Sequence, residues 1–404
     1  MSLNIDIDID VTQDDSALSQ WVNVAKPAYT SNGQPNYLDK NGEIIEGIYT
    51  EMPNDVYHSL DALSSSGLKT FFVCPAKYLR DYLSNITRKR TNAQMRTFDA
   101  GTYGHELCLE PHGFYERYFR EALPSDYPDA LSTISQIENA LVEAGQPAKE
   151  GRNEKRERLI RLVPSAQKEE LKTLASIDAL LEANGFSKTE SKFDKAYRLT
   201  KANPQVQVFD AIMHENRIKH GEKKSHVTAQ AEEYDTYGTK RPIDGIVWDD
   251  AHRVQKTLLE HTECALYITN GLPEVAIFKR CPITGMMLKV KFDWLRFDDR
   301  AVDLKTTLST KADDFIRQIF KLNYDIQASF YTYVASLVGI YLSDFTFVTV
   351  EYVNLDSARA FVLSENRKVR SMKKCMDALD RFKTCKQTNV WPGYEGGLTV
   401  TVVD

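Results

Sequence analysis

The stretch between residues 288 and 305 constrains the fold more than any other part of this sequence. Two runs rich in β-branched and aromatic residues, 288–295 and 301–305, are separated by an Asp-Asp pair that is typical of a turn. The pattern predicts a β-hairpin. Facing residues of neighbouring strands lie within several ångströms of each other, so the hairpin would bring Asp293 close to Asp303.

The same hairpin carries a lysine next to its acidic residues. Asp303 and Lys305 are two residues apart on one predicted strand, so both side chains project to the same face. Carboxylate oxygens suit Mg²⁺ or Mn²⁺, and a lysine beside such an ion could position or deprotonate a water molecule. A surface ion pair is the simpler interpretation of an Asp-x-Lys triplet. Two acids in this spacing favour metal-assisted hydrolysis of a phosphodiester.

Two residues outside the hairpin could complete such a site. Glu274 lies on the preceding predicted strand and can supply a third carboxylate. His105 follows Gly101 and Gly104 on a helix predicted over 99–110, where the glycines would allow close approach of a neighbouring element. An imidazole is a common metal ligand, although a single histidine is more often structural.

Strands and helices alternate through the C-terminal third. Strands are predicted over 274–278 and 345–352, and helices over about 310–320, 325–342 and from Ser364 onward. Thr310-x-x-Asp313 resembles a capping box, and Ser364 is expected to cap the last helix. The inward faces of the first and last of these helices are expected to carry Phe315, Ile316, Ile319, Phe320, Val369, Met372, Met376, Leu379 and Phe382. The alternation predicts an α/β layered core.

Composition narrows the class of protein. The 404 residues are 42% hydrophobic and 27% charged, which excludes a disordered, collagen-like or coiled-coil chain. The net charge of −6 does not decide for or against nucleic acid, because local patches do. With no secretory leader and no CxxC pair, the six cysteines are weak evidence for disulfides, and a cytoplasmic protein is expected. The 18 residues between Asp325 and Asp344 are too few and too polar for a membrane span, so they predict a buried helix.

The chain is expected to have three regions. Residues 1–45 combine an acidic start with turn formers and are expected to be a poorly ordered leader, with an edge strand as the alternative. Residues 46–392 would form the main domain, with a mainly helical insertion over about 112–270, and residues 393–404 a tail. The basic stretch 149–161 is interpreted as a solvated helix or mobile segment, with a DNA-contacting arm as the alternative. No internal repeat is evident.

Several short motifs, in their order along the chain, resemble the exonuclease VIII (RecE-type) branch of the PD-(D/E)XK nuclease superfamily. That branch is similar to the RecB nuclease domain and, more distantly, to lambda exonuclease. The motifs are 47–58, 63–69, 74–77, 101–111, Glu274, Asp293, 303–306, 324–331 and 347–351. The resemblance implies a restriction-endonuclease-like core, with a mixed central sheet flanked by helices and a helical insertion. Phe292 stands where the motif name has proline, and Cys74 lacks partners spaced for an iron–sulfur cluster.

The resemblance also implies roles for single residues. His105, Asp293 and Asp303 would bind metal with the main-chain carbonyl of Leu304, and Glu274 would lie near a second ion. Lys305 would orient or activate water. Gln327 and Tyr331 would brace the site or contact DNA, with core packing as the alternative. Mg²⁺ is the implied ion, two ions are expected, and Mn²⁺ is expected to substitute. The candidate DNA contacts are Ser66, Lys69, Arg88, Lys89, Arg90 and Arg96.

The activity implied by the resemblance is hydrolysis of the 5′-ended strand of double-stranded DNA, which leaves 3′ overhangs for recombination by strand annealing in a phage or prophage. A ring-like homotetramer and a RecT-like annealing partner are implied with it, and no membrane. A catalytically silent DNA-end-binding or assembly protein on the same fold is the alternative, and a scaffold protein built on the helical middle is another. Spacing and composition leave strand polarity, and exonuclease against endonuclease, open.

Overall fold

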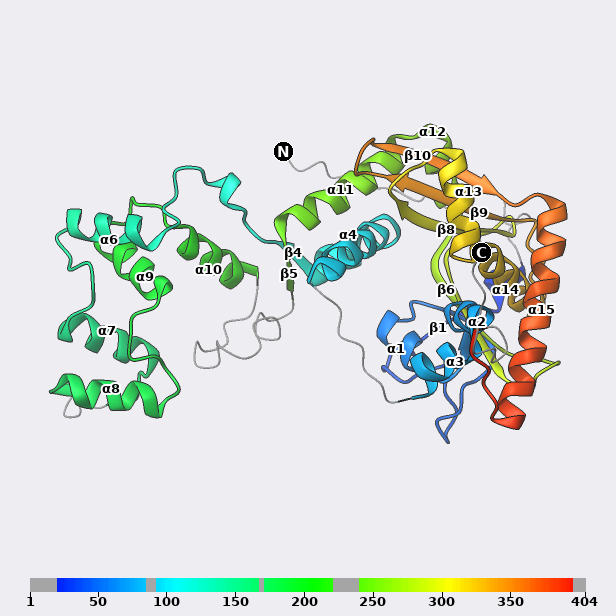
Figure 1. Ribbon diagram of the computed structural model, residues 1–404, viewed down its shortest axis with the longest axis horizontal. Helices are drawn as coiled ribbons and strands as arrows, with labels where there is room; N and C mark the ends of the chain where they lie inside the picture. The colour runs from blue at the N-terminus through cyan, green and yellow to red at the C-terminus, as the bar shows by residue number, and fades with distance from the viewer. Residues whose placement is uncertain (1–19, 85–91, 167–170, 221–239, 395–404) are drawn as a thin grey trace, which may run out of the picture. The chain divides into compact units, whose positions relative to one another are not determined.

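The computed structural model describes residues 20–84, 92–166, 171–220 and 240–394 (Figure 1). The chain divides into two compact units. Unit 1 comprises residues 1–110 and 251–404, and unit 2 comprises residues 111–250.

The centre of unit 1 is a mixed eight-stranded sheet in the order β1-β2-β6-β7-β8-β9-β10, with β3 paired to β7 off this path. Its strands are β1 Lys26–Pro27, β2 Gly47–Thr50, β3 Leu63–Ser64, β6 Gly271–Arg280, β7 Met287–Arg296, β8 Arg300–Thr307, β9 Asp344–Glu351 and β10 Ser357–Val362. β6, β7 and β8 form an antiparallel meander, whereas β8 and β9 are parallel. Parallel neighbours need a crossover, and the helices between β8 and β9 supply it.

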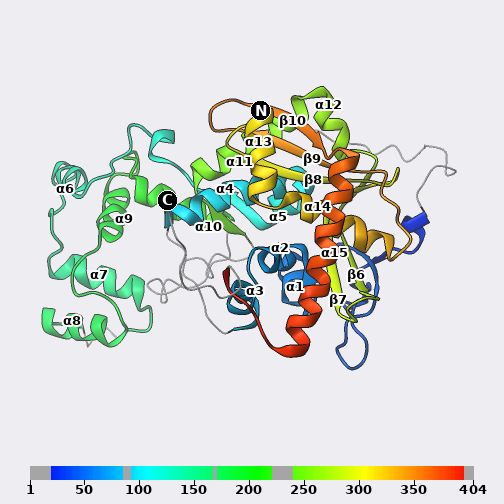
Figure 2. The same cartoon turned by 45° about the vertical axis from the view of Figure 1, so that its right-hand side comes forward.

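Helices cover both faces of this sheet (Figures 1 and 2). Those of unit 1 are α1 Asn54–Ser59, α2 Ser65–Val73, α3 Pro75–Tyr78, α4 Asn92–Leu109, α12 Thr262–Ala265, α13 Ala312–Lys321, α14 Tyr324–Ser336 and α15 Glu365–Thr388. α11 Gly245–Glu260 enters unit 1 at residue 251. α2, α13, α14 and α15 pack on one face, while α4, α11 and α12 pack on the other. None of the helices in the described ranges has the length and apolar content that a membrane crossing requires.

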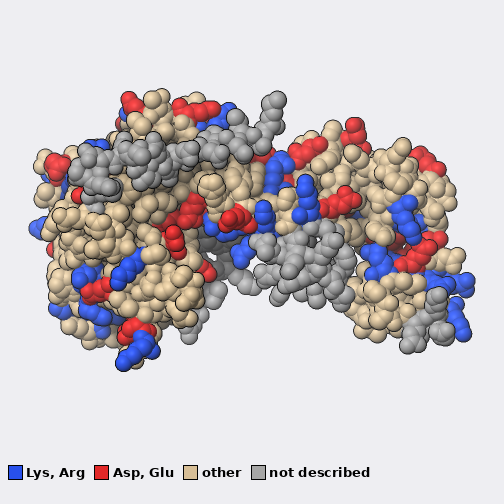
Figure 3. All heavy atoms as spheres, turned by 180° about the vertical axis from the view of Figure 1, so that it is seen from behind, with Lys and Arg blue, Asp and Glu red and all other residues tan. Residues whose placement is uncertain are grey.

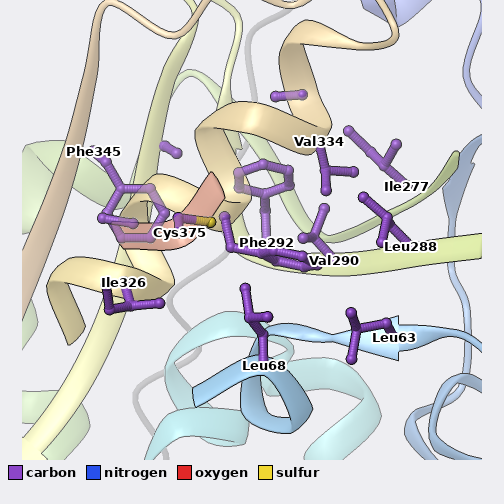
Figure 4. Close-up of a cluster of buried hydrophobic side chains, with 14 of the residues drawn as sticks. Leu63, Leu68, Ile277, Leu288, Val290, Phe292, Ile326, Val334, Phe345 and Cys375 are labelled. Carbon is purple, nitrogen blue, oxygen red and sulfur yellow. The ribbon is translucent and has the colours of Figure 1, made fainter. Parts of the chain in front are cut away.

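The main core lies between the sheet and the helices of the first face. Figure 4 shows Leu68 of α2, Phe292 of β7 and Ile326 of α14 directed toward one another. Alternate residues of β9 serve the two faces, so Phe347 joins this core and Val348 joins the smaller core under α4 and α11. All six cysteines are buried free thiols. The mixed sheet with flanking helices confirms the predicted α/β fold class.

Some predicted features of the C-terminal third are wrong in detail. Thr310 does not cap α13, because its backbone N–H donates to Glu351 Oε2 at 2.8 Å and the helix begins at Ala312 without a side-chain cap. The helix predicted over 325–342 ends at Ser336, and Gly339 adopts a φ of +84° in the turn that follows. The strand predicted over 345–352 is β9, and Ser364 caps α15 by accepting from Arg367 N at 3.3 Å.

The expected inward faces of two helices are narrower than predicted. Phe315 and Ile319 of α13 are buried, but Ile316 and Phe320 are 42% and 44% exposed. Val369 of α15 is 70% exposed. Each helix lies across one sheet face and therefore buries a single stripe, so apolar residues at its margin stay in solvent.

The N-terminal region 1–45 was expected to be a poorly ordered leader, and this is wrong for residues 20–45. Trp21 is 3% exposed and joins the main core, while Ala28 and Tyr37 are buried against β2 and β6. The backbone N–H of Ala28 donates to Thr50 O at 2.8 Å, which adds this segment to the sheet edge. Aromatic burial outweighs the turn-rich composition here. Residues 1–19 lie outside the described residues, as do residues 395–404 of the expected tail.

Residues 251–270, which the sequence assigned to the helical insertion, belong to unit 1. Val254 and Leu258 of α11 and Ile268 pack against Val302 and Leu304 of β8. The sequence pattern assigned this segment to the insertion because its polar outer face resembles that of the charged helices before it.

Unit 2 is mainly helical, with a short parallel pair of strands. Its elements are α5 Pro111–Arg117, β4 Tyr118–Arg120, α6 Ile134–Glu143, α7 Arg152–Leu162, α8 Leu174–Ala183, α9 Lys192–Ala202, α10 Phe209–His220 and β5 Arg241–Ile243. Two small apolar clusters hold it together: one joins α6 to α9 and the other joins α7 to α8.

Contrary to the sequence expectation, unit 2 contains an internal repeat. Helices α6 and α7 correspond to α8 and α9 at a constant offset of forty residues, without a gap. Positions with the same residue in both copies are Leu131 and Leu171, Thr133 and Thr173, Ile137 and Ile177, Leu141 and Leu181, Gly145 and Gly185, Glu150 and Glu190, Lys155 and Lys195, Arg158 and Arg198, Leu159 and Leu199, and Pro164 and Pro204. Both glycines end the first helix with positive φ, of +72° and +77°.

The two copies exchange contacts reciprocally. The first helix of each copy packs on the second helix of the other copy, through equivalent residues such as Ile137 on Leu199 and Ile177 on Leu159. The polar contacts obey the same exchange: Lys155 pairs with Asp178 at 2.7 Å, and its equivalent Lys195 pairs with Glu138, the equivalent of Asp178, at 2.9 Å. The repeat therefore builds a module with approximate two-fold symmetry.

Candidate active site

The two strands of the predicted hairpin separate where its acidic residues lie. Pairing between β7 and β8 is limited to Trp294 with Val302 and Leu295 with Ala301. At the next position, the Asp293 carboxylate takes the place of a backbone acceptor, because Leu304 N–H donates to Asp293 Oδ2 at 2.7 Å. The hairpin prediction is therefore correct, and its opening creates room for side chains between the two strands.

His105 reaches this opening from α4. Gly101 and Gly104 let the helix approach closely: a Cβ on Gly101 would lie 2.8 Å from Thr306 Oγ1, and one on Gly104 would lie 3.0 Å from Val254 Cβ. The approach brings His105 Nε2 to 2.9 Å from Asp293 Oδ2. Burial opposes the charge on His105, but the pairing with Asp293 prevails and raises its pKa to about 9.

Glu274 joins the same cluster from β6. The pairs that flank it, Pro273 with Trp294 and Val275 with Phe292, put Glu274 opposite Asp293 on the neighbouring strand. Ligand atoms of His105, Glu274 and Asp293 all lie within 4.8 Å of one another. Like charges facing each other across strands are destabilising, so this pair requires a positive charge between or beside them.

Lys291 supplies one such charge. It lies two residues before Asp293 on β7, forms an ion pair with Glu274 and donates to Asn54 Oδ1 at 2.8 Å. Burial raises the pKa of the Glu274 carboxyl despite this pairing. The backbone of Glu274 has a φ of +56°, a conformation that L-residues rarely adopt. Sequence reasoning missed Lys291, whose alternation with Asp293 on the strand was the available signal.

Asp303 lies next to this cluster but is not one of its three members. Its Oδ2 lies 2.6 Å from Lys305 Nζ, and its Oδ1 accepts from the side-chain amide of Gln327. Burial raises the pKa of Asp303, whereas attraction to Asp303 and Asp293 overcomes burial and raises the pKa of Lys305 above its usual range. Lys305 is therefore charged at neutral pH, which favours positioning and charge stabilisation over deprotonation of water.

Gln327 and Tyr331 share one face of α14, as their spacing predicted. Gln327 connects Asp303 to Lys69 of α2, whose Nζ donates to Gln327 Oε1 at 2.8 Å. Tyr331 Oη donates to the backbone oxygen of Lys291 at 2.9 Å, and its ring packs edge-on against Phe292. Tyr331 thus holds the strand that carries Asp293, while Gln327 contacts the site itself.

The remaining candidate DNA contacts are distributed unevenly. Ser66 is exposed at the start of α2, and Lys69 lies beside the carboxylates as described above. Arg88, Lys89 and Arg90 lie outside the described residues, and nothing is described of the Arg96 side chain. On the face drawn in Figure 3, basic and acidic side chains intermix without a single dominant basic patch.

The donor set fits a divalent cation. Two carboxylates and one imidazole converge from three elements, and Asp303 offers a buried Oδ2 whose one described partner is the Lys305 ammonium. Oxygen-rich ligands with one nitrogen suit Mn²⁺ and Mg²⁺. Within the described ranges, His105, Glu274 and Asp293 form the cluster of this kind, so a second ion would depend on Asp303 and groups outside the cluster.

Comparison with known proteins gives one family match and several similar solved structures. Residues 208–401 match the family described as a PDDEXK-like domain of unknown function (DUF3799). A crystal structure described as "Putative exonuclease" from Eubacterium rectale shares 14% identity over 69% of this chain and 91% of that chain, with a TM-score of 0.30. The structure of a protein named SSO0001 shares 15% identity over 40% of this chain and 69% of that chain, with a TM-score of 0.20.

The comparison with curated proteins gives no match. The family match and the mixed sheet with its flanking helices agree with the predicted restriction-endonuclease-like fold. They support assignment of this domain to the PD-(D/E)XK superfamily and leave the RecE-type branch as a resemblance of sequence motifs.

Proposed function

We propose that this protein is a metal-dependent nuclease that hydrolyses DNA phosphodiesters at the opening between β7 and β8. The observation that carries the proposal is the convergence of His105, Glu274 and Asp293 beside the Asp303–Lys305 pair. Each of these residues lies in one of the sequence motifs that resemble the RecE-type nucleases. The family match to a PDDEXK-like domain supports the same reaction class.

His105, Asp293 and Glu274 would hold the cation, and Asp303 would complete its ligands. A bound divalent cation supplies Lewis-acid activation of the phosphoryl group and of water. The chain's own residues contribute orientation and charge. Gln327 fixes the rotamer of Asp303, and the charged Lys305 neutralises negative charge that develops on a phosphoryl oxygen nearby.

The finer assignment is an exonuclease of RecE type, which acts on the 5′-ended strand of duplex DNA and leaves 3′ overhangs. It extends to two Mg²⁺ ions, a ring-like tetramer and a RecT-like annealing partner. The support for these features is the ordered set of sequence motifs from residue 47 to residue 351.

An end-labelled linear duplex tests the proposal. With Mg²⁺ or Mn²⁺, we expect nucleotides to be released from the 5′-labelled end before the 3′ label is lost. A covalently closed circular duplex of the same sequence should remain intact, since an exonuclease requires an end. Cleavage of the circle would replace the exonuclease by an endonuclease.

Two variants identify the site that is responsible. Lys305→Ala and Asp303→Ala should each abolish release of nucleotides while the circular dichroism spectrum stays that of the native protein. Full activity in either variant would overturn the assignment of the site. Wild-type protein that binds duplex ends but releases no nucleotide with either metal would favour the silent DNA-end-binding protein instead.

A further inference from the structure

Lys69 is a half-buried lysine that has no carboxylate partner among the described residues. Its ammonium group donates to one amide oxygen, Gln327 Oε1, and lies 5.1 Å from the centre of the Tyr324 ring. Lys305 Nζ lies 5.2 Å from the same ring, so two ammonium groups share one aromatic neighbour. No described carboxylate forms an ion pair with Lys69, and the adjacent Asp303 is paired with Lys305.

Two lysines of unit 1 that are more deeply buried than Lys69 have complete sets of partners or a carboxylate. Lys291 has the Glu274 carboxylate and Asn54. Lys289 donates to Tyr57 O at 2.8 Å, Leu60 O at 2.7 Å and His58 O at 3.3 Å. All three donor hydrogens of Lys289 thus have acceptors, whereas Lys69 has one acceptor for its three. Enclosure by itself therefore does not explain Lys69.

A buried cation is tolerated when an anion or several acceptors compensate for its lost hydration. Burial and repulsion from Lys305 lower the pKa of Lys69 to about 8, which agrees with a missing anion. A second unpaired group lies one helical turn away. Ser65 is 6% exposed, and its Oγ has no hydrogen-bond partner in the described structure. Residues four apart share a face of the helix, so Ser65 and Lys69 lie on the same side of α2.

We propose that α2 provides a phosphate-binding site beside the carboxylates, in which Lys69 pairs with a backbone phosphate of the nucleic-acid strand and Ser65 lies on the same face. The inference rests on the proposed function, and it adds a contact from α2, which lies outside the matched residues 208–401. The phosphate would accept the remaining hydrogen bonds of the Lys69 ammonium group. It would also offset the repulsion between the charges of Lys69 and Lys305. Gln327 then links the phosphate site to Asp303.

The salt dependence of DNA binding tests this proposal with the full-length protein. The affinity for a short blunt duplex is measured by fluorescence anisotropy in EDTA, over a series of salt concentrations. Lys69→Met should weaken binding by about tenfold and lower the slope of log affinity against log salt by about one, as expected for one lost phosphate contact. Lys69→Arg, which keeps the charge, should restore the slope.

Lys279→Met is the matched control. It also removes one lysine charge from unit 1, but Lys279 pairs with Glu46 at the end of β6, so its slope should equal that of the wild type. Duplexes with and without a 5′-terminal phosphate distinguish the source of the anion. A Lys69 effect in both identifies an internal phosphodiester, and an effect confined to the phosphorylated duplex identifies the terminal phosphate.

A measurement without substitution guards against a variant that misfolds. Lysine Nζ resonances of the wild type should report a Lys69 pKa near 8 in the free protein and a higher value with the duplex bound. An unchanged salt slope in Lys69→Met, or an unchanged Lys69 resonance on binding, would overturn the inference. If the wild type hydrolyses DNA and the slope is unchanged, the inference fails alone. If the slope changes but neither metal supports hydrolysis, the proposed function fails alone.

Discussion

Two arginines in the repeat of unit 2 are paired more fully than the charged groups at the candidate site of unit 1. In unit 2, Arg158 is 6% exposed and makes two hydrogen bonds of 2.8 Å to the carboxylate of Glu150. Its other nitrogen donates to Ser187 O of the second repeat at 3.0 Å. The equivalent Arg198 donates hydrogen bonds of 2.9 and 3.1 Å to the Glu190 carboxylate and one of 2.6 Å to the backbone oxygen of Pro147 in the first repeat. In each copy the guanidinium thus binds a carboxylate through two nitrogens and also donates to the backbone of the other copy.

In unit 1, charges of the candidate site are compensated only in part. Glu274 faces Asp293 on the neighbouring strand, Asp303 Oδ2 has only the Lys305 ammonium among the described groups, and no described carboxylate pairs with Lys69. Such a group is costly to bury, so a folded protein keeps it where a ligand, ion or substrate supplies the missing partner. Incomplete pairing does not identify functional charge by itself, because Arg156 Nε of unit 2 also lacks a hydrogen bond. What distinguishes the candidate site is that several such groups lie side by side.

The largest expected effect is on catalysis. Asp293→Asn keeps the volume and an acceptor for Leu304 N–H but removes the charge that the cation and His105 require. We expect nuclease turnover to fall by at least about a thousandfold, because loss of a single preorganised electrostatic contact already costs a factor of 10² to 10³. The measurement is single-turnover hydrolysis of a linear duplex. Residual activity above a tenth of the wild type would show that Asp293 holds no essential charge.

The next effect is on stability, and it tests the repeat in unit 2. Arg158→Met removes both hydrogen bonds to the buried Glu150 carboxylate and leaves it only the Lys155 ammonium at 4.0 Å, so we expect the free energy of local unfolding to fall by about 3 kcal/mol. Arg198→Met is the matched variant in the other copy, where Lys195 stays 3.3 Å from the Glu190 carboxylate. Hydrogen exchange of amides in α6 to α9 measures both.

If the module has the two-fold symmetry described above, the two substitutions should destabilise it to a similar extent. If Arg158→Met greatly lowered the free energy of local unfolding and Arg198→Met hardly changed it, the equivalent contacts of the two copies would contribute unequally to stability.

Sequence patterns were most informative where spacing alone determines proximity. The hairpin, the facing of Asp293 and Asp303, and the shared strand face of Asp303 and Lys305 follow from a side-chain period of two. The glycines at 101 and 104 correctly indicated a helix that approaches another element closely. Each of these inferences needs only local geometry, which a single sequence contains.

Contacts between distant segments were not predictable in this way. The Lys291–Glu274 pair and the link from Lys69 through Gln327 depend on which strands and helices become neighbours. The repeat was missed for another reason: its copies share scattered apolar and charged positions, and the equivalence of Glu150 with Glu190 becomes visible once both carboxylates are seen to bind equivalent arginines.

A smaller effect on stability is expected from pH. Pairing with Asp293 raises the pKa of His105 to about 9 in the folded protein, against about 6.5 when unfolded. This stabilisation is complete below pH 6.5 and is lost as pH rises through 9, and it amounts to at most about 3 kcal/mol. With chelator present, thermal unfolding should therefore occur at lower temperature at pH 9.5 than at pH 6.5.

His105→Gln is the control, since an amide does not titrate in this range. The variant should lose most of the decrease in melting temperature between the two pH values. An equal decrease in the variant would assign the pH dependence to other groups.

The smallest expected effect concerns helix caps in the two repeats. Thr133 Oγ1 accepts from Gln136 N at 3.3 Å, and its equivalent Thr173 accepts from Ser176 N at 3.1 Å. Replacing either threonine by alanine removes an N-cap, which costs about 1 kcal/mol. Because the two helices hold equivalent places in the exchanged packing, the two losses should agree within about 0.5 kcal/mol and add in the double variant. Hydrogen exchange of α6 and α8 in the three variants measures this, and a double variant much less stable than the sum would mean that the copies unfold as one cooperative body.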